Sequence, residues 1–194
     1  PDAARRRMTG RITAQSKLTH DITRLDVQLD EPLDYTAGQF ADISIDNMPG
    51  VSRSYSFATP SQPDGRLSFF VRKVPGGIFS TTVNEQDLVG QPMQIEGPSG
   101  NFWLRSSDAP MLLLAGGSGL APVLALLQDA LAKGVTRSTT LLFGACTEAD
   151  LYALDEIESI ARRWQGNFRF IPILSDCSSG HDWTGRRGLV GELI

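Results

Sequence analysis

The pattern of hydrophobic and polar positions changes about halfway along the chain. Before about residue 105, short runs rich in Val, Ile, Phe and Thr alternate with clusters of Pro, Gly, Asn and Asp. Strand-like runs separated by turn residues at this spacing are typical of a β-barrel or a β-sandwich. One helix is expected in this part, starting near Ser80, which is a good N-cap residue. The strand-like runs cover residues 22–29, 40–45, 52–58 and 67–73.

Beyond residue 105 the pattern alternates between buried strands and helices. Residues 110–115 form a continuous apolar run, which is expected of a strand covered on both faces. Apolar side chains then recur at helical spacing from residue 123 to residue 131, and Gly134 is placed to end that helix. The order β-α-β-α-β predicts a parallel sheet with right-handed crossovers. The second strand, the second helix and the third strand are expected at residues 139–143, 149–163 and 168–174.

This change of pattern predicts two domains, at residues 1–107 and 108–194. Three strands and two helices are only half of a doubly wound α/β domain, so we expect the second domain to be incomplete at its C-terminal end. The chain begins at Pro1 without an initiator Met and ends at Ile194 without a polar tail. We therefore interpret it as a piece of a longer protein.

Composition argues against several classes of function. The net charge of −4 argues against a nucleic-acid-binding protein, which normally has a basic face. No stretch approaches the roughly 18 apolar residues of a membrane span, and no signal peptide is visible. Cys146 and Cys177 form no CxxC motif, which fits a reducing cytoplasm, and they are too few to hold an iron–sulfur cluster. His20 and His181 show no metal-ligand spacing, so no metal site is expected.

The segment Arg53-Ser54-Tyr55-Ser56 carries the first candidate chemistry. In a strand, Arg53 and Tyr55 share one face, while Ser54 and Ser56 share the other. The Arg53 guanidinium can bind a phosphate in fork geometry, the Tyr55 ring can stack on a planar heterocycle, and the Ser56 hydroxyl can donate or accept a hydrogen bond. An ordinary barrel strand with one exposed arginine explains the same residues. For this segment alone, that is the stronger explanation.

A second candidate follows one strand later. A run that ends with Phe70-Val71-Arg72 leads into Gly76-Gly77-Ile78-Phe79-Ser80. Glycines allow backbone amides to approach an anion closely, and a helix that starts near Ser80 would direct its positive N-terminal end at that anion. A glycine-rich hairpin loop with a capping serine is about equally well supported.

The strongest candidate is the segment Gly116-Gly117-Ser118-Gly119-Leu120-Ala121-Pro122. It follows a buried strand and opens a helix, which is the position of a dinucleotide-binding turn. Pro122 replaces the usual third glycine, and proline is tolerated in the first turn of a helix. A plain strand-to-helix turn is the weaker alternative.

The end of the second strand in such a domain normally contacts the ribose. Here it is Phe143-Gly144-Ala145-Cys146, followed by Glu148 and Asp150, with no Lys or Arg in the loop. A 2′-phosphate would lack a cationic partner there, which favours NADH over NADPH unless an arginine from elsewhere reaches the loop. For Cys146 itself, a small buried apolar side chain is the favoured interpretation.

Taken in this order, Arg53–Ser56, Gly76–Ser80 and Gly116–Pro122 resemble the ferredoxin–NADP⁺ reductase superfamily. Within it, the chain is most similar to the reductase components of bacterial ring-hydroxylating dioxygenases and multicomponent monooxygenases. Gly97–Phe102 and Trp183–Gly188 add to the resemblance. The resemblance implies an antiparallel Greek-key β-barrel that binds FAD, followed by a doubly wound α/β domain with a parallel sheet that binds NADH.

The resemblance also implies roles for individual residues. Arg53 would hold the FAD pyrophosphate, Tyr55 would stack on the isoalloxazine, and Ser56 would lie near flavin N5, so Tyr55 and Ser56 are the expected catalytic residues. Residues 70–72 would line the flavin or its ribityl chain, and residues 77–80 would meet the pyrophosphate. The whole expected cofactor-binding set is Arg53, Ser54, Tyr55, Ser56, Phe70, Val71, Arg72, Gly76, Gly77, Ile78, Phe79, Ser80, Gly116, Gly117, Ser118, Gly119, Pro122, Gly144 and Cys146.

The implied activity is electron transfer. NADH, with its phosphates near Gly117–Gly119, would deliver hydride to FAD, and the electrons would pass singly to an iron–sulfur centre that feeds a terminal oxygenase. A 2Fe–2S cluster is expected on a separate ferredoxin or ferredoxin domain. The reductase module of a flavohaemoglobin-like chain and an FAD-binding fragment without turnover are the alternatives. Cys146 stands where many relatives carry Arg, which weakens any claim for NADPH.

Overall fold

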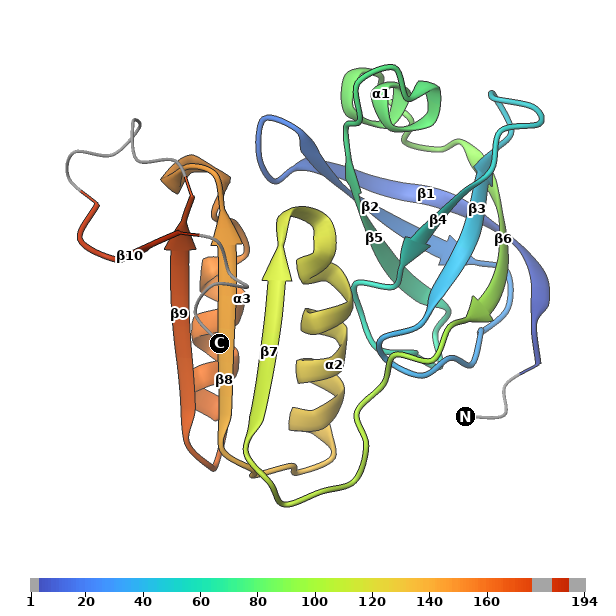
Figure 1. Ribbon diagram of the computed structural model, residues 1–194. Helices are drawn as coiled ribbons and strands as arrows, with labels where there is room; N and C mark the ends of the chain where they lie inside the picture. Colours follow the sequence, from blue (N-terminus) through green and yellow to red (C-terminus); the bar gives the residue numbers. More distant parts are fainter. Residues whose placement is uncertain (1–3, 176–182, 189–194) are drawn as a thin grey trace.

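The computed structural model describes residues 4–175 and 183–188 and shows two domains side by side (Figure 1). The first is a β-barrel with a short helix at one end, and the second is a parallel sheet with two longer helices. This arrangement confirms the predicted fold class. Cys177 and His181 lie outside the described residues. In the part of the chain that the structure describes, no helix is long and apolar enough to cross a membrane.

Six antiparallel strands form the barrel. They are β1 (Arg6–Lys17), β2 (Ile22–Leu29), β3 (Phe40–Ile45), β4 (Arg53–Ser56), β5 (Arg66–Arg72) and β6 (Pro92–Ser99), and helix α1 (Ile78–Glu85) covers one end. Their order in the sheet is β4-β3-β6-β1-β2-β5. The two end strands meet where Phe57 bridges to Phe69 and the Ala58 N–H donates to the Ser68 carbonyl at 2.8 Å. This contact nearly closes the barrel.

The barrel interior is largely aliphatic and contains a group of aromatic side chains. Phe57, Phe69 and Phe79 are fully buried, and the Tyr35 ring stacks on Phe57 with the ring centroids 3.7 Å apart. Each buried side chain of this size stabilises the fold by roughly 1.5–3 kcal/mol. Because Phe79 belongs to α1, its burial fixes the start of that helix on the barrel.

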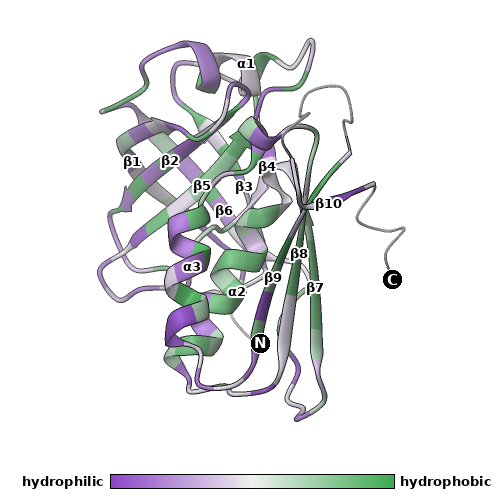
Figure 2. Cartoon of the chain, turned by 90° about the vertical axis from the view of Figure 1, so that its left-hand side faces the viewer, coloured by the Kyte–Doolittle hydropathy of each residue, from purple (hydrophilic) through white to green (hydrophobic). Residues whose placement is uncertain are grey.

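The second domain contains β7 (Met111–Gly116), β8 (Thr139–Ala145), β9 (Phe168–Leu174) and the two-residue strand β10 (Arg186–Arg187). These strands are parallel, in the order β10-β9-β8-β7. Helices α2 (Leu120–Ala132) and α3 (Leu154–Arg163) lie on the same face of the sheet (Figure 2). The predicted β-α-β-α-β order is confirmed, and β10 is an addition that the pattern did not predict.

Strand β7 differs from its prediction. Met111, Leu113 and Ala115 are buried on the helix face, but Leu112 and Leu114 on the opposite face are 47% and 40% exposed. Among the described residues, no helix lies over that opposite face. The expectation of burial on both faces is therefore wrong for this part of the chain.

Helix α1 starts near Ser80 as predicted, but the capping role predicted for Ser80 is wrong. The helix begins at Ile78 with Gly77 as its N-cap, and no side chain caps it. The Ser80 hydroxyl instead accepts a hydrogen bond from the Val74 N–H at 2.9 Å. Ser80 therefore holds the loop that precedes the helix, and the first amides of α1 stay open.

Helix α3 begins at Leu154 rather than at residue 149. Ala153 has a φ angle of 55°, a left-handed conformation that a right-handed helix does not continue through. A 3₁₀ turn, Glu148–Asp150, precedes it and is closed by a capping box between Thr147 and Asp150. Gly134, by contrast, follows the end of α2 with a φ angle of 72°, as predicted.

The two domains share an apolar contact. Ile22 and Phe70 of the barrel are buried in the same cluster as the residues under α2 and α3. The ring of Phe70 meets that of Tyr152, in the β8–α3 connection, edge to face with centroids 5.7 Å apart. This contact holds the barrel against the second domain. The boundary predicted between residues 107 and 108 stays a prediction.

Candidate functional site

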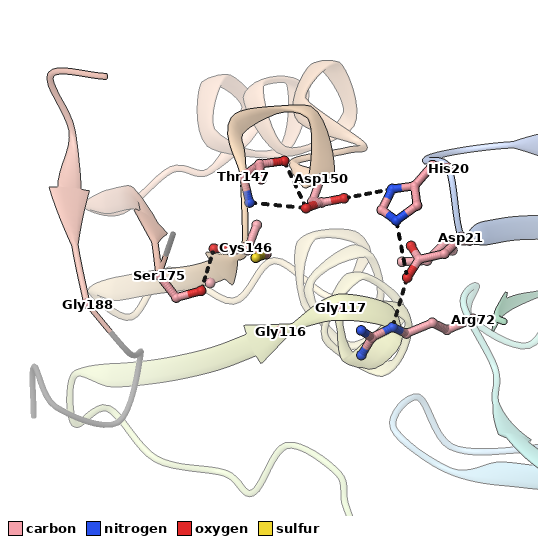
Figure 3. Close-up of a pocket in the computed structure, with 13 residues that line it drawn as sticks. His20, Asp21, Arg72, Gly116, Gly117, Cys146, Thr147, Asp150, Ser175 and Gly188 are labelled. Atoms are coloured by element: carbon pink, nitrogen blue, oxygen red, sulfur yellow. Dashed lines mark hydrogen bonds and ion pairs between the residues drawn. The ribbon is translucent and has the colours of Figure 1, made fainter. Parts of the chain in front are cut away.

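A cavity of about 630 Å³ lies where the two domains meet (Figure 3). On the side of the second domain it lies at the carboxyl ends of the parallel strands, which is where open α/β sheets bind their ligands. On the other side, the barrel supplies charged side chains from the β1–β2 turn and from the end of β5. The lining residues are His20, Asp21, Ile22, Arg72, Gly116, Gly117, Gly144, Ala145, Cys146, Thr147, Asp150, Ser175 and Gly188.

The predicted dinucleotide turn forms one edge of this cavity. Gly117 to Gly119 make a 3₁₀ turn that leads directly into α2, and no side chain caps either helix. Gly117 has a left-handed φ angle of 53°. The Tyr152 hydroxyl donates to the Gly117 carbonyl at 2.6 Å, and this hydrogen bond fixes the turn to the β8–α3 connection. The positive end of α2 and its unpaired backbone amides therefore suit a diphosphate.

The remaining residues predicted in this turn lie beside the cavity and do not line it. Ser118 and Gly119 belong to the 3₁₀ turn, and Pro122 lies in the first turn of α2. Gly116 ends strand β7 and does line the cavity.

Arg72 reaches this turn from the barrel. A Cβ atom placed on Gly117 would lie 3.4 Å from the Arg72 Nη1 atom. The Arg72 Nε donates to the Asp21 carboxylate at 3.2 Å. Burial would raise the pKa of Asp21, but hydrogen bonds from Thr19 and Arg72 and the charge of His20 together lower it below its usual value. The structure thus places the Arg72 guanidinium beside the nucleotide turn.

The two residues before Arg72 are differently placed. Phe70 is buried against Tyr152 at the contact between the domains, and the Val71 side chain is fully buried in the barrel core. Only their backbone groups remain to line a flavin.

The predicted ribose contacts also lie at the cavity. Gly144 and Cys146 line it, and Cys146 is an exposed free thiol. The interpretation of Cys146 as a buried apolar side chain is therefore wrong. The Thr147 N–H and hydroxyl donate to the Asp150 Oδ2 atom at 3.1 Å and 2.9 Å, so this carboxylate is held at the rim.

His20 is a cavity residue that the sequence pattern did not indicate. Its Nδ1 atom lies 3.1 Å from the Asp150 Oδ1 atom, and its Nε2 atom lies 3.9 Å from the Asp21 Oδ2 atom (Figure 3). The His20, Asp21 and Asp150 ligand atoms all lie within 4.8 Å of one another. Because Arg72 and Thr147 already bind the two carboxylates, we interpret the group as an ion-pair network.

The predicted flavin segment forms strand β4 on the barrel. Arg53 is exposed, and its Nη1 donates to the Ser52 carbonyl at 2.7 Å. The Ser54 hydroxyl is bound to the Asp42 carboxylate. Tyr55 and Ser56 are half-buried, and burial raises the pKa of Tyr55 although the Arg53 charge opposes this.

The Tyr55 ring packs on Phe79 with centroids 5.6 Å apart, which brings β4 beside the start of α1. Gly77 is required there, because a Cβ atom would lie 2.8 Å from the Ser80 Oγ atom and 3.1 Å from the Val74 carbonyl oxygen. Gly76 has no atom within 4 Å of such a position, so its loop is open to a ligand.

The Phe79 side chain is buried in the barrel, so only its backbone could meet a phosphate, whereas Ile78 is exposed. The uncapped start of α1, the open glycine loop and the exposed guanidinium of Arg53 fit a diphosphate-bearing flavin. They fit it through backbone amides more than through side chains.

Comparison with known proteins identifies both domains. Residues 9–103 match the family described as oxidoreductase FAD-binding domain, and residues 113–194 match the oxidoreductase NAD-binding domain family. The chain is 44% identical over 183 residues to XylA, the electron transfer component of xylene/toluene monooxygenase from Pseudomonas putida, covering 94% of this chain and 52% of that protein. This chain belongs to the ferredoxin–NADP⁺ reductase superfamily.

Two further known proteins match along most of the chain. A ferredoxin–NAD(P)(+) reductase component of naphthalene 1,2-dioxygenase/salicylate 5-hydroxylase systems from a Ralstonia species is 38% identical over 188 residues, 95% of this chain and 55% of that protein. The crystal structure of the cytochrome P450 reductase GcoB from Amycolatopsis matches with a TM-score of 0.89 at 32% identity, covering 98% of this chain and 57% of that one. The chain spans about half the length of the curated relatives it matches.

These matches confirm the predicted superfamily and the predicted class, a flavoprotein oxidoreductase. They also confirm FAD and NAD as the nucleotides of its two domains. The roles of individual residues are not carried by the matches, and they rest on the geometry above.

Proposed function

We propose that this chain is the FAD- and NADH-binding part of a reductase that supplies electrons to an oxygenase system. The observation that carries the proposal is the cavity between the domains, where Arg72 of the barrel lies against Gly117 of the nucleotide turn. A nucleotide held there is in contact with both domains, as transfer between two bound cofactors requires. Bound FAD would supply the redox chemistry, accepting hydride and releasing single electrons.

On the barrel, Arg53 binds the FAD pyrophosphate and the Tyr55 ring packs against the isoalloxazine. The packing of Tyr55 on Phe79 supports this assignment, because it brings the Arg53 strand beside the open amides of residues 78–80. Ser56 follows Tyr55 on the same strand, and its hydroxyl is assigned to the flavin N5 edge. Tyr55 and Ser56 are thus the proposed contacts to the reacting part of the flavin.

At the edge of the cavity, the amides of the Gly117–Gly119 turn, of which Gly117 lines the cavity, bind the NADH diphosphate together with the guanidinium of Arg72. The Asp21 carboxylate holds the Arg72 Nε atom at 3.2 Å and leaves the two η nitrogens for the ligand. A charge-assisted bond from arginine to phosphate is among the stronger hydrogen bonds in proteins. This assignment moves Arg72 from the flavin set to the nicotinamide nucleotide set.

NADH is the proposed nucleotide in preference to NADPH. Gly144, Cys146 and Asp150 lie at the end of the cavity that the second strand supplies, and the loop that carries them has no Lys or Arg. A 2′-phosphate near the Asp150 carboxylate would meet a like charge. Among the described residues, Arg72 is the arginine that lines the cavity, and it lies beside the phosphate turn.

The electron acceptor is proposed to be a ferredoxin or a ferredoxin domain with a 2Fe–2S cluster, which passes electrons to a terminal oxygenase. The relatives described above support this, since they are named as electron-transfer or reductase components of oxygenase systems. A cytoplasmic location is part of the proposal, and the exposed free thiol of Cys146 is consistent with a reducing compartment.

The proposal is tested by reconstituting the protein with FAD and assaying NADH oxidation with ferricyanide, which takes electrons from reduced flavin without an iron–sulfur centre. FAD-dependent turnover is expected. A protein that binds FAD stoichiometrically but does not oxidise NADH would instead be a flavin-binding fragment.

A further inference from the structure

We propose that His20 and Asp150 form a clasp between the two domains that positions the cavity for NADH. The inference deepens the proposed function and rests on it. His20 lies in the turn between β1 and β2 of the barrel, and Asp150 lies in the turn between β8 and α3 of the second domain. Their side chains meet across the cavity with the His20 Nδ1 atom 3.1 Å from the Asp150 Oδ1 atom (Figure 3).

Asp150 is held rigidly on its own side of the cavity. Its Oδ2 atom accepts hydrogen bonds from the Thr147 N–H and hydroxyl, so Oδ1 is left for His20. The same short segment continues to Tyr152, whose ring packs on Phe70 of the barrel and whose hydroxyl binds the Gly117 carbonyl at 2.6 Å. The segment 147–152 therefore contacts the barrel at two points and the phosphate turn at a third.

His20 is held on the barrel side by its neighbours. The Lys17 ammonium donates to the His20 carbonyl at 3.1 Å, and Thr19 binds the Asp21 carboxylate at 2.9 Å. The imidazole lies between the carboxylates of Asp150 and Asp21, and Asp21 in turn binds Arg72. This row of four contacting side chains, Asp150, His20, Asp21 and Arg72, runs from the second domain to the arginine assigned to the NADH diphosphate.

The expected effect of replacing His20 follows from its place between Asp150 and Asp21. The carboxylates of Asp150 and Asp21 would then face each other from opposite domains without the imidazole between them, and like charges repel. The Asp150 turn would be less firmly held, and so would the Gly117 turn that Tyr152 supports. NADH binding should weaken, while FAD binding should not change, because the FAD residues assigned above, Arg53 and Tyr55, do not line this cavity.

The test compares His20→Ala, His20→Asn, Asp150→Ala and the double variant His20→Ala/Asp150→Ala. Exposed ion pairs contribute little, and 74% of the His20 side chain is exposed, so His20→Ala should raise KM for NADH about two- to fivefold. The limiting rate at saturating NADH should stay unchanged. His20→Asn keeps a donor for Asp150 and should recover most of the affinity. The double variant should be no worse than Asp150→Ala alone.

The matched control is Arg66→Ala. It breaks an exposed 3.7 Å ion pair with Asp64 on the surface of the barrel domain, and it should leave KM for NADH unchanged. A second readout needs no turnover. Amide hydrogen exchange of residues 147–152 should be faster in His20→Ala than in the native protein or in Arg66→Ala.

Unchanged exchange in His20→Ala, additive effects in the double variant, or a loss that His20→Asn does not recover would overturn the clasp. A native protein that binds FAD but does not oxidise NADH would overturn the proposed function, and the exchange experiment would still decide whether the pair links the domains.

Discussion

Arg72 ends strand β5 of the barrel, but its side chain lies beside the nucleotide turn of the second domain. Its Nη1 atom would lie 3.4 Å from a Cβ atom placed on Gly117. Arg72→Ala should raise KM for NADH by about ten- to hundredfold, which corresponds to the ~1.5–3 kcal/mol of a hydrogen bond to a charged group. FAD binding should not change. Steady-state kinetics with NADH and a flavin titration measure the two effects separately. Loss of FAD with an unchanged KM would return Arg72 to the flavin site.

The conformation of Gly117 gives a second prediction. A side chain in the left-handed region costs roughly 1–2 kcal/mol, so Gly117→Ala, at a φ angle of 53°, should lower Tm by a few degrees and weaken NADH binding. Gly119 is the matched control, because its φ angle is −64° and no atom lies within 4 Å of its Cβ position. Gly119→Ala should leave Tm unchanged. If Gly117→Ala and Gly119→Ala lowered Tm equally, the left-handed conformation of Gly117 would not be the cause of the loss.

Arg53 gives a third prediction. Arg53→Ala should weaken FAD binding at least about tenfold, because a charge-assisted bond to the pyrophosphate is lost. Titration of the apoprotein with FAD, followed by flavin fluorescence, measures the affinity. Arg66→Ala, at another exposed arginine of the barrel, should bind FAD normally. If Arg53→Ala retains FAD stoichiometrically and tightly, the side chain has only a structural role.

The carboxyl of Glu156 predicts a pH-dependent change in stability. Burial raises its pKa above the usual 4.5, although the Arg24 charge and the hydrogen bond with Gln128 oppose the shift. The folded state therefore binds this proton more tightly than the unfolded state, and stability falls as pH rises through the folded pKa. Glu156→Gln carries no charge, so it should have a higher Tm than the native protein at pH 7. At pH values below the usual pKa of 4.5, the difference in Tm between the two proteins should vanish.

Melting curves across this pH range would check the sign. An equal difference in Tm at acid and neutral pH would show that ionisation of Glu156 is not the cause.

Much of the fold could be predicted because each face of a strand or helix has its own environment. The alternation along β2 and the helical spacing within α2 separate buried from half-buried positions, and periodicity reports such faces directly. The start of α3 could not be predicted this way. The apolar spacing continues through Ala153, while a left-handed residue and the capping box of Thr147 and Asp150 interrupt the helix.

The site was only partly predictable, because a sequence pattern reports local structure but not the contacts between domains. The turn at Gly116–Gly119 follows from a local pattern, since a buried strand, a glycine turn and a helix are consecutive in the chain. The approach of Arg72 to Gly117 and of His20 to Asp150 depends on how two domains pack. No spacing within either domain encodes these contacts. The Cys146 side chain is exposed for the same reason, because it faces the cavity between the domains.

The most direct measurement is the anaerobic reaction of the FAD-reconstituted protein with NADH, followed by the visible absorbance of the flavin. The account predicts that NADH bleaches the flavin and that NADPH does so more slowly, because the loop that carries Cys146 and Asp150 offers no cation to a 2′-phosphate. A flavin spectrum that NADH leaves unchanged would contradict the central claim that the cavity between the domains presents NADH to FAD.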